Sequence, residues 1–302
     1  MSSKYTKQWF TQRAFSSLKK IREGVWDYSD SLLIYVSSGV DVYESLQAEN
    51  TPYHQLVTKP EHEYLKTIAD QVASSLPDSF DYIDLGPGTE HKEQYLFEAL
   101  KSQGKKFTYL PVDISDYYLS IARTHAEKQG IPCNPVQSSF EELPAHLGDV
   151  SRPRFISLGL TFSNYEPSVI LELLQKIAGP GGVAFIGAQI RDRVDMDVLQ
   201  KIYQEDVSHA MDEKLRLLGL DPETDITPRV ADETICAWTT VIHSNSELEK
   251  VGIQTQDRLL VFQSRRYTKA SLEASLKNVD YQLFDTGSSF IGSLIRTSHT
   301  IS

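Results

Sequence analysis

The stretch Asp-Tyr-Ile-Asp-Leu-Gly-Pro-Gly-Thr-Glu-His-Lys, residues 81–92, ends a short apolar run with two glycines, Gly86 and Gly88, on either side of a proline. The apolar run predicts a buried strand over 80–85, and the residues from 91 predict the start of a helix. Glycines at such a turn let the backbone bend tightly and let a ligand approach it closely. The stretch therefore predicts a ligand-binding turn at the end of a sheet strand.

Strands and helices alternate outward from this turn. A helix is expected over 61–76, because its apolar residues recur at helical spacing. Further strands are expected at 107–112, 133–137, 154–160 and 182–190, with helices at 91–102, 116–129 and 167–178 between them. This alternation predicts an α/β fold with a mostly parallel sheet that is covered on both faces.

The alternation stops after Ile190. A long helix is expected over 195–218, a loop over 220–228, strands at 237–243 and 258–263, and a helical turn at 271–276. The C-terminal pattern predicts a β-hairpin around Gly287, and the N-terminal region predicts helices at 8–21 and 29–36. We therefore expect a core formed by 60–193 and 267–302, and a discontinuous α+β substrate domain formed by 1–59 and 194–266.

Composition narrows the class of protein. The 302 residues are 40% hydrophobic and have a formal net charge of -11. An acidic chain without a dense basic block is a poor candidate for binding nucleic acid or an anionic membrane. The short basic pairs Lys19-Lys20 and Arg265-Arg266 are interpreted as solvated surface. The two cysteines, the polar N-terminal residues and the lack of a long apolar run favour a cytoplasmic location.

The glycine turn favours one cofactor over another. A dinucleotide fingerprint needs a third glycine, and that position holds His91, while Asp84 would repel a pyrophosphate. S-adenosylmethionine (SAM) has no phosphate. Asp84 can face its cationic end, and Asp113, which lies 29 residues later and ends the next strand, can accept both ribose hydroxyls. The alternative is that the glycines form a structural turn and that Asp113 caps the helix from 116.

The sequence resembles the histidine-specific N-methyltransferase family, which includes histidine Nα-methyltransferases and fungal indole-alkaloid N-methyltransferases. Three segments resemble the family's motifs: Asp-Leu-Gly-Pro-Gly-Thr-Glu-His-Lys (84–92), Tyr-Leu-Pro-Val-Asp-Ile-Ser (109–115) and Leu-Gly-Leu-Thr-Phe-Ser-Asn-Tyr-Glu-Pro (158–167). The resemblance is strongest over 80–190. It implies a Rossmann-like class I methyltransferase core that uses SAM as cofactor.

The resemblance also implies roles for individual residues. It assigns cofactor binding to Gly86, Lys92 and Asp113, and to the pair Ser139-Phe140, in which Phe140 covers the adenine. Gly88 is expected at the same site because it belongs to the glycine turn. It assigns Asn164 to the substrate's amino-acid end. Tyr53 and Tyr203 match, more loosely, two tyrosines that bind the same end. These three residues are the expected catalytic positions, since they would orient the amine that is methylated.

One departure from the family concerns the substrate. Members that act on histidine have a glutamate and a serine that bind the imidazole, and here the matching positions are Phe262 and Ser264. A phenyl ring cannot accept an imidazole N–H, and an unpaired buried donor costs about 1–3 kcal/mol. If the alignment shifts by one residue, Gln263 takes the glutamate position. We therefore expect the substrate to be a small-molecule amine, an amino acid or its derivative, other than histidine.

Other functions remain open at this level. The same scaffold also supports O- or S-methylation, and a SAM-binding partner subunit without activity would share the turn. A nicotinamide-dependent oxidoreductase is disfavoured by the missing third glycine. The histidines show no metal-ligand spacing such as H-E-x-x-H, so no metal is expected. The oligomeric state is not specified by the sequence.

Overall fold

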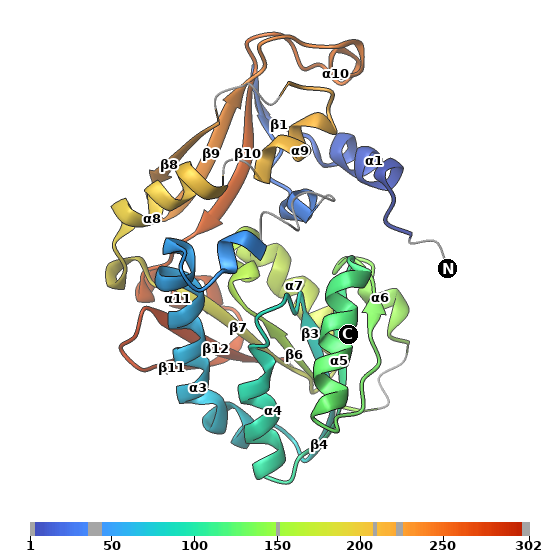
Figure 1. Cartoon of the computed structure of the whole chain (residues 1–302), viewed down its shortest axis with the longest axis vertical. Helices are drawn as coiled ribbons and strands as arrows, with labels where there is room; N and C mark the ends of the chain where they lie inside the picture. The colour runs from blue at the N-terminus through green and yellow to red at the C-terminus, as the bar shows by residue number, and fades with distance from the viewer. Residues whose placement is uncertain (1–3, 36–43, 149–151, 208–209, 222–225, 298–302) are drawn as a thin grey trace. The chain divides into compact units, whose positions relative to one another are not determined.

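The computed structural model of the chain describes residues 4–35, 44–148, 152–207, 210–221 and 226–297. It divides the chain into two compact units, each built from two segments (Figure 1). The smaller unit comprises Met1–Val57 and Val194–Arg266, and the larger unit comprises Thr58–Arg193 and Tyr267–Ser302. Each unit has its own sheet.

The larger unit contains a seven-stranded sheet in the order β11-β12-β7-β6-β3-β4-β5. Strands β3 to β7 pair in parallel. β12 pairs antiparallel with β7, and β11 pairs antiparallel with β12 at the edge of the sheet. The strands are β3 (Ser79–Leu85), β4 (Lys106–Asp113), β5 (Val136–Gln137), β6 (Arg154–Leu158), β7 (Val183–Gln189), β11 (Asp280–Asp285) and β12 (Phe290–Arg296). This order confirms the predicted Rossmann-like class I fold with a C-terminal β-hairpin.

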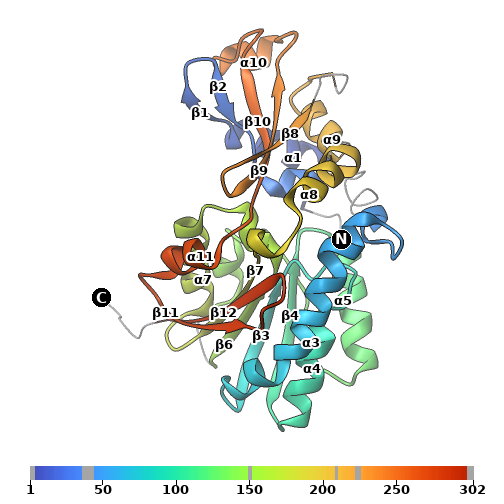
Figure 2. The same ribbon diagram turned by 90° about the vertical axis from the view of Figure 1, so that its left-hand side faces the viewer.

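Helices cover both faces of this sheet. Figure 2 shows α3, α4 and α5 on one face and α7 and α11 on the other. The helical segments are α3 (Lys59–Ser74), α4 (Glu93–Ser102), α5 (Asp116–Lys128), α6 (Leu143–His146), η3 (Leu160–Asn164), α7 (Pro167–Ala178), η4 (Arg191–Arg193) and α11 (Lys269–Leu276). The π-helical turn η2 (His54–Thr58) precedes α3, and all but its last residue belong to the smaller unit. None of the described helices is long and apolar enough to cross a membrane.

The central strands are buried on both faces, as their composition requires. Every residue of β6 and β7 is buried, and the apolar side of α7 packs in the same core cluster. Parallel strands covered on both sides have near-continuous apolar sequences, because neither face meets water. The carboxyl ends of β3, β4 and β6 are therefore fixed by a rigid core.

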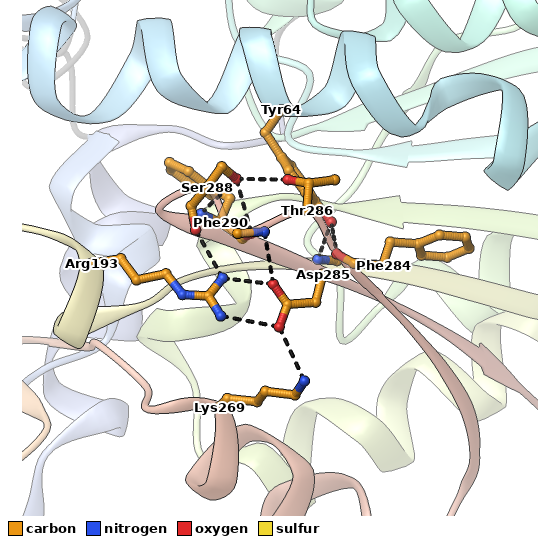
Figure 3. Close-up of polar contacts among 10 residues, drawn as sticks. Tyr64, Arg193, Lys269, Phe284, Asp285, Thr286, Ser288 and Phe290 are labelled. Atoms are coloured by element: carbon orange, nitrogen blue, oxygen red, sulfur yellow. Dashed lines mark hydrogen bonds and ion pairs between the residues drawn. The ribbon is translucent and has the colours of Figure 1, made fainter.

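A network of charges holds the turn of the C-terminal hairpin (Figure 3). Arg193 Nη1 and Nη2 donate to the two carboxylate oxygens of Asp285 at 2.7 and 3.0 Å, and Lys269 Nζ lies 3.1 Å from Oδ2. The Arg193 guanidinium holds the pKa of Asp285 well below its usual range. Gly287 follows with a φ of +82°, which favours glycine. The network ties the end of the first segment of the larger unit to its second segment.

The smaller unit contains a five-stranded sheet in the order β1-β2-β10-β9-β8. Strand β2 pairs in parallel with β10, and the other pairs are antiparallel. The strands are β1 (Lys19–Arg22), β2 (Val25–Asp27), β8 (Thr227–Ala231), β9 (Thr234–Thr240) and β10 (Arg258–Arg265). The helical segments are α1 (Lys7–Ser17), η1 (Ser31–Tyr35), α8 (Met196–Ile202), η5 (Tyr203–Val207), α9 (Ala210–Arg216) and α10 (Ser246–Lys250).

Several local predictions for this unit are wrong. The helix expected over 8–21 ends at Ser17, and residues 19–22 form strand β1 instead. The helix expected over 29–36 is the 3-10 turn η1, and residue 36 lies outside the described residues. A single helix was expected over 195–218, but three elements occur there: the helix α8, the π-helical turn η5, which begins at Tyr203, and the helix α9. Residues 208–209 lie outside the described residues.

The loop expected over 220–228 is also partly wrong. Its last two residues already belong to β8, and 222–225 lie outside the described residues. Strand β9 begins at Thr234, three residues before the expected start. Two hairpin strands therefore replace the expected loop and strand, with Asp232 at a φ of +51° in the turn between them.

Candidate functional site

The glycine turn of residues 86–88 has the geometry that its sequence requires. Gly86 and Gly88 have φ values of +71° and +63°, a region that other residues rarely adopt. A Cβ on Gly86 would lie 3.7 Å from Cζ of Phe140, so the phenyl ring lies beside this turn. His91, at the position of a third fingerprint glycine, has a φ of +54°. The turn therefore leaves backbone next to an aromatic ring, which suits a flat ligand.

Asp84 is anchored at the end of β3. Its Oδ2 accepts from the hydroxyl of Tyr109 at 2.7 Å, and its Oδ1 accepts from that of Ser157 at 2.6 Å. Burial raises the pKa of Asp84 to about 6, with a further contribution from the carboxylate of Glu93. Neither hydroxyl partner was expected from the sequence, because both come from neighbouring strands. Asp84 thus presents a partly buried negative charge beneath the glycine turn.

Asp113 ends β4 and does not cap the following helix. Its Oδ1 accepts from the backbone N–H of Ser115 at 2.8 Å, while Ser115 is itself the N-cap of α5. The alternative that Asp113 caps this helix is therefore wrong. Burial raises the pKa of Asp113 to about 7. A strand-end carboxylate that is not used as a cap is available for a ligand.

Ser139 and Phe140 are connected to Asp113 through the backbone. The N–H of Ser138 donates to the carbonyl of Asp113 at 3.1 Å, which joins the end of β4 to the residues that follow β5. Ser139 is buried and Phe140 is half-buried, and the ring of Phe140 lies 6.4 Å from that of Tyr165. The structure thus brings together three of the predicted cofactor-binding elements: the glycine turn, the strand-end acid and the aromatic ring.

Lys92 lies between two carboxylates. Its Nζ is 3.1 Å from Oε2 of Glu61 and 3.0 Å from Oε2 of Glu90. Burial lowers the pKa of Lys92, but the two carboxylates outweigh it and raise that pKa well above its usual value. A Cβ on Gly159 would approach Glu61 Oε1 to 3.0 Å, so glycine makes room for this ion pair. Glu61 was not expected from the sequence, since it lies 31 residues from Lys92.

Asn164 is the last residue of η3, which follows the carboxyl end of β6. Within the described part of the chain, its side-chain amide makes no hydrogen bond to another residue. The alternative that Asn164 forms an Asx-turn before Pro167 would require such a bond, and it is therefore not observed. The half-buried amide has both its donor and its acceptor atoms available.

The expected substrate residues of the smaller unit form an aromatic cluster, which consists of Tyr53, Tyr203 and Phe262. The ring of Tyr203 lies 6.5 Å from that of Tyr53 and 5.5 Å from that of Phe262. Tyr203 and Phe262 are buried, and Tyr53 is half-buried. The π-helical turn that begins at Tyr203 places its ring against β10. The sequence identified all three positions, although two of them matched only loosely.

The register of β10 distinguishes Phe262 from Gln263. Successive residues of a strand point to opposite faces. Gln263 donates to the hydroxyl of Ser29 at 3.0 Å, while Phe262 contacts Tyr203, and Ser264 shares a bonding partner with Tyr203. Phe262, and not Gln263, therefore lies on the side of the aromatic cluster.

Arg266 is that shared partner, and its predicted exposure is wrong. The residue is only 1% exposed, whereas the pair Arg265-Arg266 was expected at the surface. Its Nη1 donates to Oγ of Ser264 at 2.7 Å, and its Nη2 donates to Oη of Tyr203 at 2.7 Å. The bond to Tyr203 spans 63 residues of sequence, so no local pattern could have indicated it.

One group of three potential metal ligands occurs among the described residues: His91, Glu93 and His125, with ligand atoms within 4.8 Å of one another. His125 Nδ1 lies 2.7 Å from Glu93 Oε1, at hydrogen-bond distance. Two ligands of one tetrahedral zinc ion lie farther apart, at roughly 3.3 Å given metal–ligand distances near 2.0 Å. We therefore interpret this group as hydrogen-bonded side chains.

Comparison with known proteins identifies the family. The model of the family described as "Histidine-specific methyltransferase, SAM-dependent" matches residues 17–210, which is more than half of the chain. Histidine N-alpha-methyltransferase of Mycobacterium tuberculosis is 29% identical over 138 residues, or 44% of this chain and 43% of that protein. 4-Dimethylallyltryptophan N-methyltransferase easF of Claviceps fusiformis is 28% identical over 160 residues, or 49% of this chain and 43% of that protein.

These alignments span less than half the length of the curated relatives. Among solved structures, protein PH0226 of Pyrococcus horikoshii OT3 aligns with a TM-score of 0.48 and 12% identity, over 87% of this chain and all of that one. The 1,6-didemethyltoxoflavin-N1-methyltransferase of Burkholderia thailandensis aligns with a TM-score of 0.46 and 12% identity, over 89% and 88%. By the match over residues 17–210, the chain belongs to the SAM-dependent, histidine-specific methyltransferase family, and its cofactor is SAM.

Proposed function

We propose that this protein is a SAM-dependent N-methyltransferase that acts on the amine of an amino acid or of a small molecule derived from one. The observation that supports it most is the arrangement of the strand ends in the larger unit. The glycine turn after β3, Asp113 at the end of β4 and Phe140 after β5 are joined by backbone hydrogen bonds and a ring contact. In a doubly wound sheet, ligands bind at these strand ends.

In this proposal the larger unit binds SAM. Asp113 accepts the two ribose hydroxyls, Phe140 covers the adenine with Ser139 beside it, and Gly86 and Gly88 allow the cofactor to approach the backbone. Lys92 binds the carboxylate of the cofactor's amino-acid end, and Asp84 contributes negative charge near its cationic groups. Each role matches the chemistry of the residue: carboxylates accept from hydroxyls, and an ammonium donates to a carboxylate.

For methyl transfer the protein mainly has to position the amine and the methyl donor, and it does not need a strong general base. Bound SAM would supply an activated methyl group to the lone pair of the amine nitrogen. The amine nitrogen would give up a proton to solvent, since an ammonium has no free lone pair. Asn164 Oδ1 is proposed to accept an N–H of the amine, so that the lone pair is directed at the methyl group.

The smaller unit is proposed to bind the rest of the substrate. Tyr53 and Tyr203 orient the amino-acid end, and Phe262 and Ser264 contact the distal part. Phe262 occupies the position at which histidine-binding members of the family have a glutamate, and it lies against Tyr203. An aromatic side chain favours apolar surface by about 25 cal/mol per Å² buried. We therefore propose a larger or less polar amine than histidine as the substrate.

A binding and product screen tests this function. The protein, loaded with S-adenosylhomocysteine, is screened for thermal stabilisation by amino acids and amines, and the compounds that bind are incubated with SAM and analysed by mass spectrometry. The expected product is heavier by one CH₂ group, with the added methyl on nitrogen by fragmentation. A product with the methyl group on oxygen or sulfur would show that the protein is an O- or S-methyltransferase and would contradict the proposal. Cofactor binding without any methylated product would indicate a partner subunit.

A further inference from the structure

We propose that Arg266 fixes the hydroxyls of Tyr203 and Ser264 as hydrogen-bond donors, so that the smaller unit selects substrates that present acceptors to both: a carboxylate at the amino-acid end for Tyr203, and an acceptor atom on the distal group for Ser264. This inference rests on the proposed function, because it specifies the class of substrate that the aromatic cluster binds. It assigns to Arg266 a positioning role that neither its sequence context nor the family description indicates.

The polarity follows from the chemistry of the guanidinium group. Arginine has five N–H donors, no acceptor, and keeps its proton in proteins. Both Tyr203 Oη and Ser264 Oγ lie 2.7 Å from a nitrogen of Arg266, so both oxygens must accept in these bonds. Each hydroxyl has one hydrogen, and that hydrogen must point away from Arg266.

The two hydroxyl hydrogens have no acceptor within the described part of the chain. Tyr203 Oη and Ser264 Oγ make no further hydrogen bond there beyond the one from Arg266. Tyr203 is 5% exposed and Ser264 is 3% exposed, so the two groups are largely shielded from water. A buried donor needs a partner, since leaving it unpaired is unfavourable. A bound ligand with an acceptor atom would satisfy this requirement.

The charge of Arg266 reinforces the selection. Its guanidinium carbon lies 5.7 Å from the centroid of the Tyr203 ring and is almost completely buried. A positive charge bonded to a hydroxyl oxygen makes the hydroxyl a better donor and a poorer acceptor, and burial strengthens the effect. A ligand N–H directed at either oxygen would meet this positive field. The matching group is an acceptor such as a carboxylate, a carbonyl or a pyridine-type nitrogen.

Phe262 determines what surrounds that acceptor. It is on the same side of β10 as Ser264, and its ring packs on Tyr203. The distal part of the substrate would therefore combine an aromatic or apolar body with one acceptor atom. Histidine fits only in its neutral form and only through its unprotonated nitrogen, since the glutamate that would accept its N–H is replaced by Phe262.

Isosteric amino acids provide the test. Calorimetry on the protein loaded with S-adenosylhomocysteine measures the affinities of five amino acids: L-phenylalanine, its analogues with a 2-pyridyl, 3-pyridyl or 4-pyridyl ring, and 4-amino-L-phenylalanine. The buffer is mildly alkaline, so that the pyridine nitrogen is neutral. We expect at least one pyridyl isomer to bind about fivefold or more tightly than phenylalanine, which corresponds to one hydrogen bond. We expect the amino compound, which presents donors, to bind more weakly than phenylalanine.

Variants separate positioning from general structure, because the readout is the ratio of pyridyl to phenyl affinity. Ser264→Ala should reduce the ratio toward one. Arg266→Gln should also reduce it, since an amide can accept from the serine hydroxyl, whereas Arg266→Lys, which only donates, should retain part of it. Ser29→Ala is the matched control: Ser29 accepts from Gln263 on the opposite side of β10, and its loss should leave the ratio unchanged.

Three results overturn the inference: equal affinities for the pyridyl and phenyl compounds, a preference for the amino compound, or a ratio that Ser264→Ala does not change. If Arg266→Gln does not fold, Ser264→Ala still decides it. Binding of S-adenosylhomocysteine without binding of any acceptor-bearing probe also counts against it. Failure to bind S-adenosylhomocysteine at all would instead contradict the proposed function.

Discussion

Lys92 Nζ lies 3.1 Å from Glu61 Oε2, and this ion pair joins α3 to the residue that precedes α4. The side chains are 21% and 6% exposed, so the pair is largely removed from water. Burial raises the pKa of Glu61, which means that its carboxylate depends on the nearby ammonium. Because Lys92 also belongs to the glycine-rich motif, this contact connects the stability of the larger unit with the position of a predicted cofactor residue.

Removing Lys92 should therefore destabilise the fold. Lys92→Met leaves Glu61 buried without its cation, and we expect a loss of about 3–5 kcal/mol in the free energy of unfolding, as for other broken buried pairs. The double variant Lys92→Met/Glu61→Gln should recover part of the loss, since the buried charge of Glu61 is then removed together with that of Lys92, while Glu90 keeps its carboxylate. Urea denaturation of the three proteins provides the measurement.

The exposed pair of Lys176 and Glu172 is the matched control, with side chains 62% and 67% exposed. Lys176→Met should have little measurable effect, because exposed pairs contribute little. A double variant no more stable than Lys92→Met would show that the Lys92–Glu61 contact is not the source of the loss.

The affinity for S-adenosylhomocysteine should depend on pH through Asp113. Its pKa is raised to about 7 by burial, so the carboxylate takes up a proton as the pH falls through that value. A protonated carboxyl accepts ribose hydroxyls poorly, and affinity should therefore fall below pH 7, by at most about tenfold per pH unit. Calorimetry in buffers of different ionisation enthalpy should also detect proton release on binding near this pH.

Two variants test whether Asp113 causes this pH dependence of the affinity. Asp113→Asn should flatten the profile above the pKa of Asp84, which is about 6. Asp113→Ala should lower the affinity at least tenfold in alkaline buffer, since charge-assisted bonds contribute about 1.5–3 kcal/mol each. Unchanged affinity in Asp113→Ala would remove Asp113 from the cofactor site.

Asn164→Ala should separate methyl transfer from cofactor binding. The amide makes no hydrogen bond to other described residues, so its removal should leave the melting temperature and the affinity for S-adenosylhomocysteine unchanged. Turnover with the substrate found by screening should fall by about 100-fold or more, because the amine loses its orienting acceptor. Near-native turnover would mean that another residue orients the amine.

Phe262→Glu should improve the use of histidine. A carboxylate there can accept the imidazole N–H, and it would lie on the same side of β10 as Ser264 and near the positive charge of Arg266. The wild-type protein should methylate histidine poorly, and the variant should do so at least tenfold better in kcat/KM, the value of one charged hydrogen bond. Phe262→Leu, which stays apolar, should show no gain. Efficient use of histidine by the wild type, with no gain in the variant, would make Phe262 a core residue only.

Lys214 should make the smaller unit more stable in alkaline solution. It is fully buried, its Nζ donates to the carbonyls of Asp30 and Val261, and burial lowers its pKa to about 7 from an ordinary value of 10.5. Below pH 7 both folded and unfolded chains carry the proton, and the full cost of burying the charge is present. Between pH 7 and about 10 the folded chain loses the proton first, so stability should rise with pH by up to about 1.4 kcal/mol per unit.

Lys214→Met is the reference for this effect. The free energy of unfolding of this variant should not rise between pH 7 and about 10 as that of the wild type does. The wild type should therefore gain stability relative to the variant as the pH increases. Chemical denaturation between pH 6.5 and about 9.5 measures it, a range that ends before tyrosines and ordinary lysines titrate. Parallel pH profiles of the two proteins would show that Lys214 does not change its protonation on folding.

The success of sequence-based prediction differed between the units for a physical reason. The strands of the larger unit are buried on both faces, so their apolar runs are visible in the sequence, as in Val183–Gln189. Strand β1 has four exposed residues and is held by pairing with β2, which no local pattern encodes. The predicted helix there extended the pattern of α1 across a boundary that only tertiary pairing defines.

The same distinction applies to the site residues. Gly86 and Asp113 were identified because their roles depend on local backbone geometry, namely a positive φ and the end of a strand. Arg266 was assigned to the surface, because charged residues are rarely buried without partners and its partners Tyr203 and Ser264 could not be paired with it from sequence. Glu61 was overlooked for the same reason.

The parallel pairing of β2 with β10 has a consequence for synthesis of the chain. Val25 pairs with Arg258, so the N-terminal strands cannot complete their sheet until more than 230 further residues have been made. At roughly 5–20 residues per second on the ribosome, that delay is about 12–47 s. During this time the edge of β2 that later pairs with β10 is unpaired, and closing so long a loop is slow. The other edge of the pair is β1, whose exposed side chains include Lys19, Lys20 and Arg22, and charges on an edge strand disfavour association between nascent chains.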